Sequence, residues 1–278
     1  VSKFTSLKYI DISRTAISAF KYVDNMTLDY LELSTFPNLQ GIIANDCKQL
    51  TVVKCTNDPN NPIELDSRAF ANCNSLTRVY GHFKLKGIET FKGCSQLVFN
   101  EQDAYSSGTV DFINLNTATN ITIDDTNQSL LSTFEGCSNF TYDDFNYLKI
   151  RIGQQVTSIE AMFKGCSGIT GALQYDMFRT CPNLLTIKEA FSGCKLTGRF
   201  YSRTSNYSST DSTTWGILDF IPKVQDAESA FENNLIEYID NNVFAPRIIN
   251  GVTQYYDLVR IDRMFRGCTY LTTCKDTR

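Results

Sequence analysis

The apolar positions of this chain recur in a short motif, Phe-x-x-Cys-x-x-apolar. Complete copies begin at Phe70, Phe91, Phe134, Phe163, Phe178 and Phe265, and a copy one residue shorter begins at Phe191. In two weaker copies, Ala44 replaces Phe before Cys47, and Asn234 replaces Cys after Phe231. A recurring pattern of this kind predicts stacked units, each of which buries its apolar face against the next.

The predicted core consists of the motif positions themselves. They are Phe70, Cys73, Leu76, Phe91, Cys94, Leu97, Phe134, Cys137, Phe163, Cys166, Phe178, Cys181, Phe191, Cys194, Phe231, Phe265 and Cys268. If these side chains point inward, they cannot also form the surface that meets a partner. We therefore expect partner contacts to come from insertions or from an exposed strand face.

A second apolar pattern follows the motif. It appears as the sets Leu7/Ile10/Ile12, Leu28/Leu31/Leu33, Leu50/Val53/Cys55 and the shorter Leu76/Val79. The last two members of each full set are two residues apart, which is the side-chain period of a β-strand with one buried face. Successive motif phenylalanines are 13 to 43 residues apart. The chain is therefore predicted to be a mainly β, irregular solenoid of units of roughly 20 to 25 residues, some shortened and some with insertions.

Two segments carry a resemblance to a known repeat family. Residues 67–76 read Ser-Arg-Ala-Phe-Ala-Asn-Cys-Asn-Ser-Leu, and residues 189–194 read Glu-Ala-Phe-Ser-Gly-Cys. Both resemble the BspA-like leucine-rich repeat, in which Ala-Phe-x-x-Cys-x-x-Leu precedes a strand. The form Met-Phe-x-Gly-Cys at Met162 and Met264 is similar to repeats of surface proteins of gut bacteria and of virion proteins of their phages.

The resemblance implies an irregular leucine-rich-repeat solenoid with short parallel strands and some short helical turns. In leucine-rich repeats, Cys and Asn share one position and point a small polar side chain into the unit, where it can bond to the backbone. The exchange of Cys for Asn at Asn234 agrees with this pattern.

We expect a single repeat solenoid over residues 1–278, because a repeat array lengthens by adding units and need not split into separate domains as it becomes longer. The chain begins and ends inside repeat units: residues 4–7 match the second half of one, and six residues follow Thr272. Solenoid ends normally carry polar caps that cover the core. No cap is visible in the sequence, so we expect a segment of a longer protein, or ends that dock on neighbours.

The composition narrows the classes of partner. Lys and Arg number 26 against 30 Asp and Glu, a net charge of −4, so no basic excess favours nucleic acid or anionic lipid. Apolar residues make up 42% of the chain, which is enough to build a core. No apolar run approaches the roughly 18 residues of a membrane-spanning helix. We expect no nucleic-acid partner and no membrane insertion.

The cysteines admit three interpretations. Eight of the ten lie in the motif, including Cys47. A zinc site needs about four convergent ligands, but the chain has no Cys-x-x-Cys pair and a single histidine, His82. Disulfides need specific Cβ geometry, and in-register cysteines on neighbouring strands point the same way and do not offer it. The spacing between neighbouring strands by itself would allow a disulfide. Buried reduced thiols are favoured, and Cys55 and Cys274, outside the motif, are the best candidates for a disulfide.

The residues of catalytic sites are sparse in this sequence. A Cys–His pair would need His82, which stands between Gly81 and Phe83 in a strand-like stretch. Adjacent carboxylates occur at 124–125 and 143–144, but neighbours in a strand face opposite sides. We expect both pairs in solvated loops. The prediction is no catalytic residue, no metal, no cofactor and no enzyme activity.

Aromatic residues outside the repeat phase are the candidate contacts. Residues 198–216 form an insertion rich in Ser and Thr that contains Tyr201, Tyr207 and Trp215. Rigid aromatic rings among adaptable hydroxyls are typical of binding loops, and a solvated insertion is the alternative. A second aromatic pair, Tyr255 and Tyr256, follows the turn dipeptide Asn-Gly at 250–251.

Two hypotheses of function follow. The first is a non-enzymatic recognition or structural assembly module: a repeat scaffold that binds other protein chains of an assembly, or a surface protein or glycan receptor. The resemblance places it on a phage virion or a bacterial cell surface. The alternative is a carbohydrate-active enzyme or its sugar-binding appendage, with two carboxylates brought within about 10 Å from different repeats.

Overall fold

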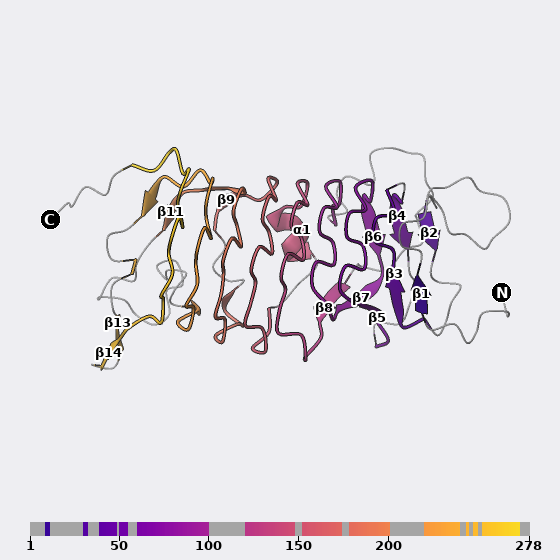
Figure 1. Cartoon of the computed structure of the whole chain (residues 1–278), viewed down its shortest axis with the longest axis horizontal. Coiled ribbons are helices and arrows are strands. Elements are labelled where there is room, and N and C mark those ends of the chain that lie inside the picture. The colour runs from indigo at the N-terminus through magenta and orange to yellow at the C-terminus, as the bar shows by residue number, and fades with distance from the viewer. Residues whose placement is uncertain are drawn as a thin grey trace. The chain divides into compact units, whose positions relative to one another are not determined.

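The computed structural model describes residues 9–11, 30–32, 39–48, 50–54, 60–99, 120–147, 152–173, 178–200, 220–239, 243–244, 247–249 and 252–272. The chain divides into two compact units: unit 1 is Val1–Asn127 with Ser132–Ile150, and unit 2 is Gln128–Leu131 with Arg151–Arg278. Successive passes of the chain lie side by side within each unit (Figure 1). The described residues form short strands, turns and one short helix, which confirms the mainly β prediction.

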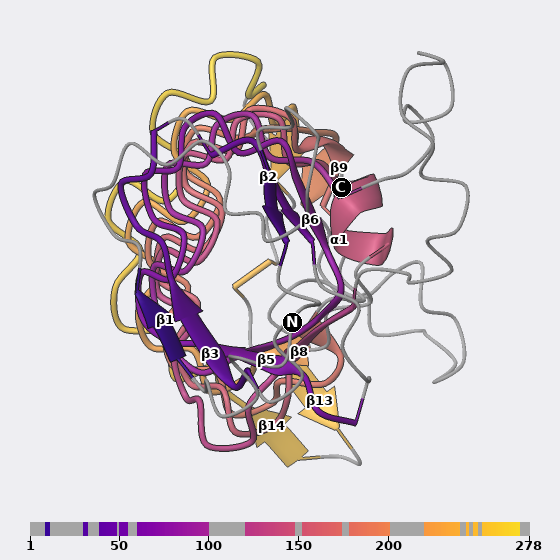
Figure 2. The same cartoon turned by 90° about the vertical axis from the view of Figure 1, so that its right-hand side faces the viewer.

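Unit 1 contains two parallel sheets. The five-stranded sheet has the order β1-β3-β5-β7-β8 and the three-stranded sheet the order β2-β4-β6. Figure 2 shows β1, β3 and β5 on one side of this unit and β2 and β6 on another. All strand pairs in both sheets are parallel, as predicted. The elements are β1 (Tyr9–Asp11), β2 (Tyr30–Glu32), β3 (Gly41–Ile43), β4 (Val52–Lys54), β5 (Ile63–Leu65), β6 (Arg78–Tyr80), β7 (His82–Leu85), β8 (Asn120–Ile123) and α1 (Tyr142–Tyr147).

In the sequence of unit 1, the motif at Phe70 stands after a strand of the five-stranded sheet and before a strand of the three-stranded sheet. β5 precedes Phe70, and β6 follows Cys73. β1, β2, β4 and β6 lie where the apolar spacing after the motif predicted strands. In β5 the outer residues Ile63 and Leu65 are buried and Glu64 is half-buried, because side chains alternate along a strand. The strands β3, β5 and β8, which precede motifs, were not predicted.

Unit 2 has shorter strand pairs. β9 (Thr170–Ala172) pairs in parallel with β10 (Lys195–Thr197), and β11 (Arg199–Phe200) pairs in parallel with β12 (Tyr238–Ile239). β13 (Arg247–Ile249) and β14 (Val252–Gln254) are antiparallel, because two connecting residues can join only an antiparallel hairpin. Before the motifs, single parallel bridges join Ser129, Ser158, Thr186, Asp226 and Arg260 in succession.

The motif phenylalanines form a stacked column in each unit. In unit 1 the ring centroids of Phe70 and Phe91 are 5.6 Å apart, and those of Phe91 and Phe134 are 5.7 Å apart. The column of unit 2 has centroid spacings of 5.4 to 5.7 Å and consists of Phe163, Phe191, Phe231 and Phe265. Each such pair contributes about 0.5–1.5 kcal/mol beyond the burial of its area. The columns therefore lie at the centre of the two cores.

Phe178 begins a copy of the motif but lies outside the column. Its ring meets that of Phe191 edge to face, at 6.2 Å and 73°. The N–H of Phe163 donates to the carbonyl of Ala190, so the repeats at Phe163 and Phe191 are direct neighbours. The copy at Phe178 follows Phe163 by 15 residues, which is too few for a complete unit of roughly 20 to 25 residues. It fills the core beside the column.

Main-chain hydrogen bonds join each motif to the repeat that follows. The N–H groups of Phe70 and Asn72 donate to the carbonyls of Thr90 and Lys92, at 2.8 and 2.6 Å. The N–H between them turns back within its own repeat, as Ala71 donates to the Arg68 carbonyl at 3.1 Å. Alternate N–H groups therefore form a ladder whose donors all point toward the next repeat in the sequence.

The side chain at the Cys position connects six of the repeats to the one before, whereas the thiol of Cys181 donates to the carbonyl of Phe178 in its own repeat. The thiols of Cys94 and Cys137 donate to the carbonyls of Phe70 and Phe91, both at 3.0 Å. At Asn234, Nδ2 donates to the carbonyl of Phe191 at 2.8 Å, so the amide replaces the thiol on the equivalent acceptor. The same thiol bond to the preceding repeat is made by Cys73, Cys194 and Cys268.

The predicted core positions are buried, with one exception. Each of them is at most 8% exposed apart from Phe265, which is half-buried. Phe265 belongs to the last motif of the described chain, and no further described repeat covers its ring. The prediction that this residue belongs fully to the core is therefore corrected.

Candidate recognition surface

The exposed large apolar residues of the described chain are concentrated in one stretch of the sequence of unit 2. Apart from Leu185, they all lie between residues 244 and 271: Phe244, Tyr255, Val259, Ile261, Tyr270 and Leu271. We call this set the terminal apolar surface. Tyr255 and Val259 are 74% and 78% exposed. Scattered exposed apolar residues are normal, whereas a concentration of them indicates an interaction site.

The aromatic candidates have different positions. Tyr201, Tyr207 and Trp215, like most of the 198–216 insertion, lie outside the described residues. Tyr255 and Tyr256 directly follow β14, and Tyr255 is exposed while Tyr256 is half-buried. Tyr255 therefore belongs to the terminal apolar surface.

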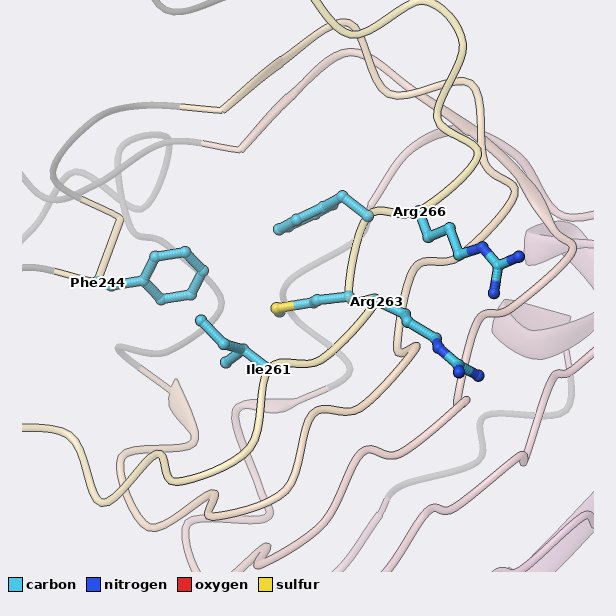
Figure 3. A pocket seen from close by; sticks show the side chains of 6 residues that line it. Phe244, Ile261, Arg263 and Arg266 are labelled. Carbon is cyan, nitrogen blue, oxygen red and sulfur yellow. The ribbon is translucent and has the colours of Figure 1, made fainter.

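A cavity of about 270 Å³ lies at the last motif of unit 2. Its lining combines the repeat residues Ile261, Met264 and Phe265 with Phe244 from the segment before β13. In Figure 3, Phe244 and Ile261 face one another across it, while Arg263 and Arg266 extend together on the other side of the main chain. The lining is mostly apolar, and the two arginines also belong to it.

The sequence pattern did not identify Ile261 as an exposed residue, because it occupies a repeat position that is buried elsewhere. Its counterparts in the preceding repeats are Ile159, Ile187 and Ala227, and all three are fully buried. Ile261 is 48% exposed because no further described repeat covers it. The expectation that repeat positions are buried therefore does not hold at Ile261.

Ion pairs between repeats cross the outer surface of each unit. In unit 1, Lys92 lies 3.1 Å from Glu89 of its own repeat and 3.0 Å from Glu135 of the next. In unit 2, Lys188 lies 3.2 Å from Glu228, and its hydrogen bond lowers the pKa of that carboxyl. Exposed ion pairs of this kind contribute about 0–1 kcal/mol each to stability. Their main effect is on which repeat can pack against which, because the charges must be complementary.

The two pairs of adjacent carboxylates at 124–125 and 143–144 include two side chains with main-chain partners of their own. Asp124 forms a turn in which Thr126 donates its N–H to the carboxylate at 2.9 Å. Asp144 is 1% exposed and lies in the first turn of α1, where its carboxylate accepts N–H groups from Thr141 and Phe99. The expectation of a solvated loop is wrong for Asp144, because its carboxylate satisfies buried main-chain donors.

The eight described cysteines are free and buried. Burial raises the pKa of the Cys73 and Cys181 thiols to about 12. A thiol needs ionisation to act as a nucleophile or metal ligand, so these side chains are chemically quiet at neutral pH. Within the described ranges, no group of three or more His, Cys, Asp or Glu is placed to hold a metal. Cys55 and Cys274 lie outside those ranges.

No protein-family model matches the chain, and no curated protein or solved structure matches it either. The part of the chain that the structure describes contains no helix with the length and apolar character needed to cross a membrane.

Proposed function

We propose that this chain is a non-enzymatic recognition or structural assembly module. Its scaffold is an irregular leucine-rich-repeat solenoid of the BspA-like type, and it binds other protein chains of an assembly, or a surface protein or glycan receptor. The observation that carries the proposal is the terminal apolar surface, where the apolar positions of a repeat are open to a partner.

The repeat arrangement supports the scaffold part of the proposal. Within each unit, motif rings stack on the rings of neighbouring repeats, and ladder bonds run between the same neighbours. Stacking of this kind is how solenoids extend. The buried thiols with raised pKa support a structural role for the motif cysteines.

The setting we propose is a phage particle or a bacterial cell surface, on the basis of the resemblance in the motif. Immunogold electron microscopy with antibodies against the whole chain would test it on particles and cells of the source. We expect gold on virions or on the outer surface of cells. Labelling confined to the cell interior would contradict the proposal.

The binding surface is tested by single substitutions that separate recognition from folding. We expect Tyr255→Ala, Tyr207→Ala and Trp215→Ala to weaken binding of the labelled chain to source particles or cells while each changes stability by less than about 1 kcal/mol. Trp215 is the most informative, because a residue that plugs its own loop would lower the melting temperature and leave binding unchanged. That result would remove the insertion from the binding surface.

A further inference from the structure

We propose that α1 of unit 1 is a flap that docks and undocks in one step, and that the carboxylate of Asp144 couples the helical turn to its attachment at Phe99. In the docked state, Asp144 is 1% exposed and Tyr142 is 7% exposed. This conformational device is independent of the proposed recognition role.

The two carboxylate oxygens of Asp144 have different partners. Oδ2 accepts the N–H of Thr141 at 2.9 Å and its hydroxyl at 2.7 Å, and the N–H of Asp144 donates back to Thr141 Oγ1 at 3.2 Å. This reciprocal pair is a capping box at the start of α1. Oδ1 accepts the N–H of Phe99 at 2.5 Å, from a residue 45 positions away in the sequence. One side chain therefore both begins the helix and attaches it to another part of unit 1.

The attachment replaces a strand at one edge of a sheet. Among the described strands, β6 is the last in the order β2-β4-β6, and α1 lies on the same side of unit 1 as β2 and β6 (Figure 2). Beside β6, the N–H of Val98 donates to the main-chain carbonyl of Thr77 at 3.2 Å. The next N–H, that of Phe99, donates to the Asp144 side chain. A side-chain acceptor can be withdrawn without opening a strand ladder.

The helix depends on this attachment because of its length. It has six residues, and isolated helices shorter than about 12–15 residues are marginal in water. Since the capping oxygen and the docking oxygen belong to the same carboxylate, loss of the helical turn displaces the acceptor of Phe99, and loss of docking removes support from the turn. The flap therefore has two states, docked and helical or undocked and unwound.

The core beneath the flap does not include α1. The N–H groups of Phe91 and Gly93 donate to the carbonyls of Thr133 and Glu135 at 2.9 and 2.6 Å. The rings of Phe91 and Phe134 stack at a centroid distance of 5.7 Å. All five residues precede α1 in the chain, so the ladder and the column of unit 1 can persist when the flap undocks.

The experiment is amide hydrogen exchange followed by NMR on the full chain. We expect Asp144→Asn to speed exchange at residue 99 about ten- to a hundredfold, because the amide has a single acceptor oxygen and no charge. The ladder amides at residues 91 and 93 should stay unchanged. Asp143→Asn is the matched control, because Asp143 is exposed and lies in the same first turn of α1. Acceleration at residue 99 in this control would overturn the assignment to Asp144.

Thr141→Val tests the coupling, because it removes the capping hydroxyl and retains both Asp144 and Phe99. We expect exchange at residue 99 to be about three- to tenfold faster, since the flap undocks in one step. Unchanged exchange at residue 99 would overturn the coupling. Equal acceleration at residues 91, 93 and 99 in either variant would overturn the separate flap, because unit 1 would then open as a whole. If Asp144→Asn does not fold, Thr141→Val decides alone.

Discussion

At the scale of single residues, the position that alternates between Cys and Asn shows how one acceptor can be satisfied in two ways. The thiol of Cys194 donates to the carbonyl of Phe163 at 3.2 Å. Asn234 donates to the carbonyl of Phe191 and also accepts the N–H of Leu196 at 2.9 Å. The amide therefore satisfies one buried group more than the thiol does.

Truncation at this position should cost more for Asn than for Cys. Asn234→Ala leaves the N–H of Leu196 buried without its acceptor, and we expect it to lower the free energy of unfolding by about 2–3 kcal/mol. Cys194→Ala is the matched control and should cost about 1 kcal/mol, because a thiol is a weak donor. Denaturant unfolding measures both. Equal losses would show that the second bond of Asn234 contributes nothing.

The buried thiols make stability depend on alkaline pH. Burial raises the pKa of Cys73 and Cys181 from 9.0 to about 12. Below pH 9 both thiols are protonated in the folded and unfolded chain, and they contribute no pH dependence. Above pH 9 the unfolded chain loses these protons first, so each thiol lowers the free energy of unfolding by about 1.4 kcal/mol per pH unit.

We expect the free energy of unfolding to fall from pH 9 to pH 10.5, and to fall less steeply in the double variant Cys73→Ala/Cys181→Ala. Unfolding in urea at several pH values measures the two slopes. The lysines and tyrosines titrate in the same range in both proteins, so the difference between slopes isolates the thiols. Parallel slopes would contradict the raised thiol pKa values.

At the scale of the repeat element, left-handed residues stand two positions before and two after the Phe of every described motif except the one at Phe178. The later position holds Gly or Asn, as at Gly193 with φ 74° and Asn233 with φ 59°. The earlier position holds residues such as Glu89 with φ 56°. Gly and Asn tolerate this region best, which explains why Gly-Cys recurs in the sequence and why Asn takes the place of Gly at Asn72 and Asn233.

Gly193 allows backbone strain to be measured without a steric clash. A Cβ at this residue would meet its nearest neighbour, the Cα of Gly165, at 3.6 Å, an ordinary contact. We expect Gly193→Ala to cost about 1–2 kcal/mol from the left-handed conformation alone. Gly193→Asn should cost less than half of that, because Asn stands at this position in two other repeats. Similar melting temperatures for the two variants would argue against the conformational explanation.

At the scale of the whole molecule, the contacts that stabilise each motif come from neighbouring repeats. The ring of Phe91 stacks between Phe70 and Phe134, and Phe191 stacks between Phe163 and Phe231. The first set belongs to unit 1 and the second to unit 2. Stability in repeat proteins is approximately a sum of such neighbour terms.

A substitution that opens a cavity in one phenylalanine column should therefore destabilise mainly the unit that contains it. We expect Phe91→Ala and Phe191→Ala each to cost about 3–5 kcal/mol. Hydrogen exchange followed by mass spectrometry should show faster exchange mainly in unit 1 for the first variant and mainly in unit 2 for the second. Equal acceleration throughout the chain in both variants would mean that the molecule opens as one cooperative body.

Much of the local architecture was determined by the sequence itself. The spacing of Phe, Cys and the following apolar residues predicted which side chains point inward, and the strands after the motif lie where the period of two placed them. These properties are local, because a turn or strand orients its own side chains. The equivalence of Cys and Asn at one inward-pointing position could be predicted from the sequence for the same reason.

The tertiary structure decided which motif copies are neighbours and which apolar residues remain open. The copy at Phe178 has the complete motif but lies outside the column. The pairing of β1, β3, β5, β7 and β8 into one sheet was not predicted, because no local period announced β3, β5 or β8. Ile261 and Phe265 carry the pattern of core residues yet line an open cavity. Stacking and exposure depend on what lies against a repeat, and the sequence pattern within one repeat does not specify which segment that is.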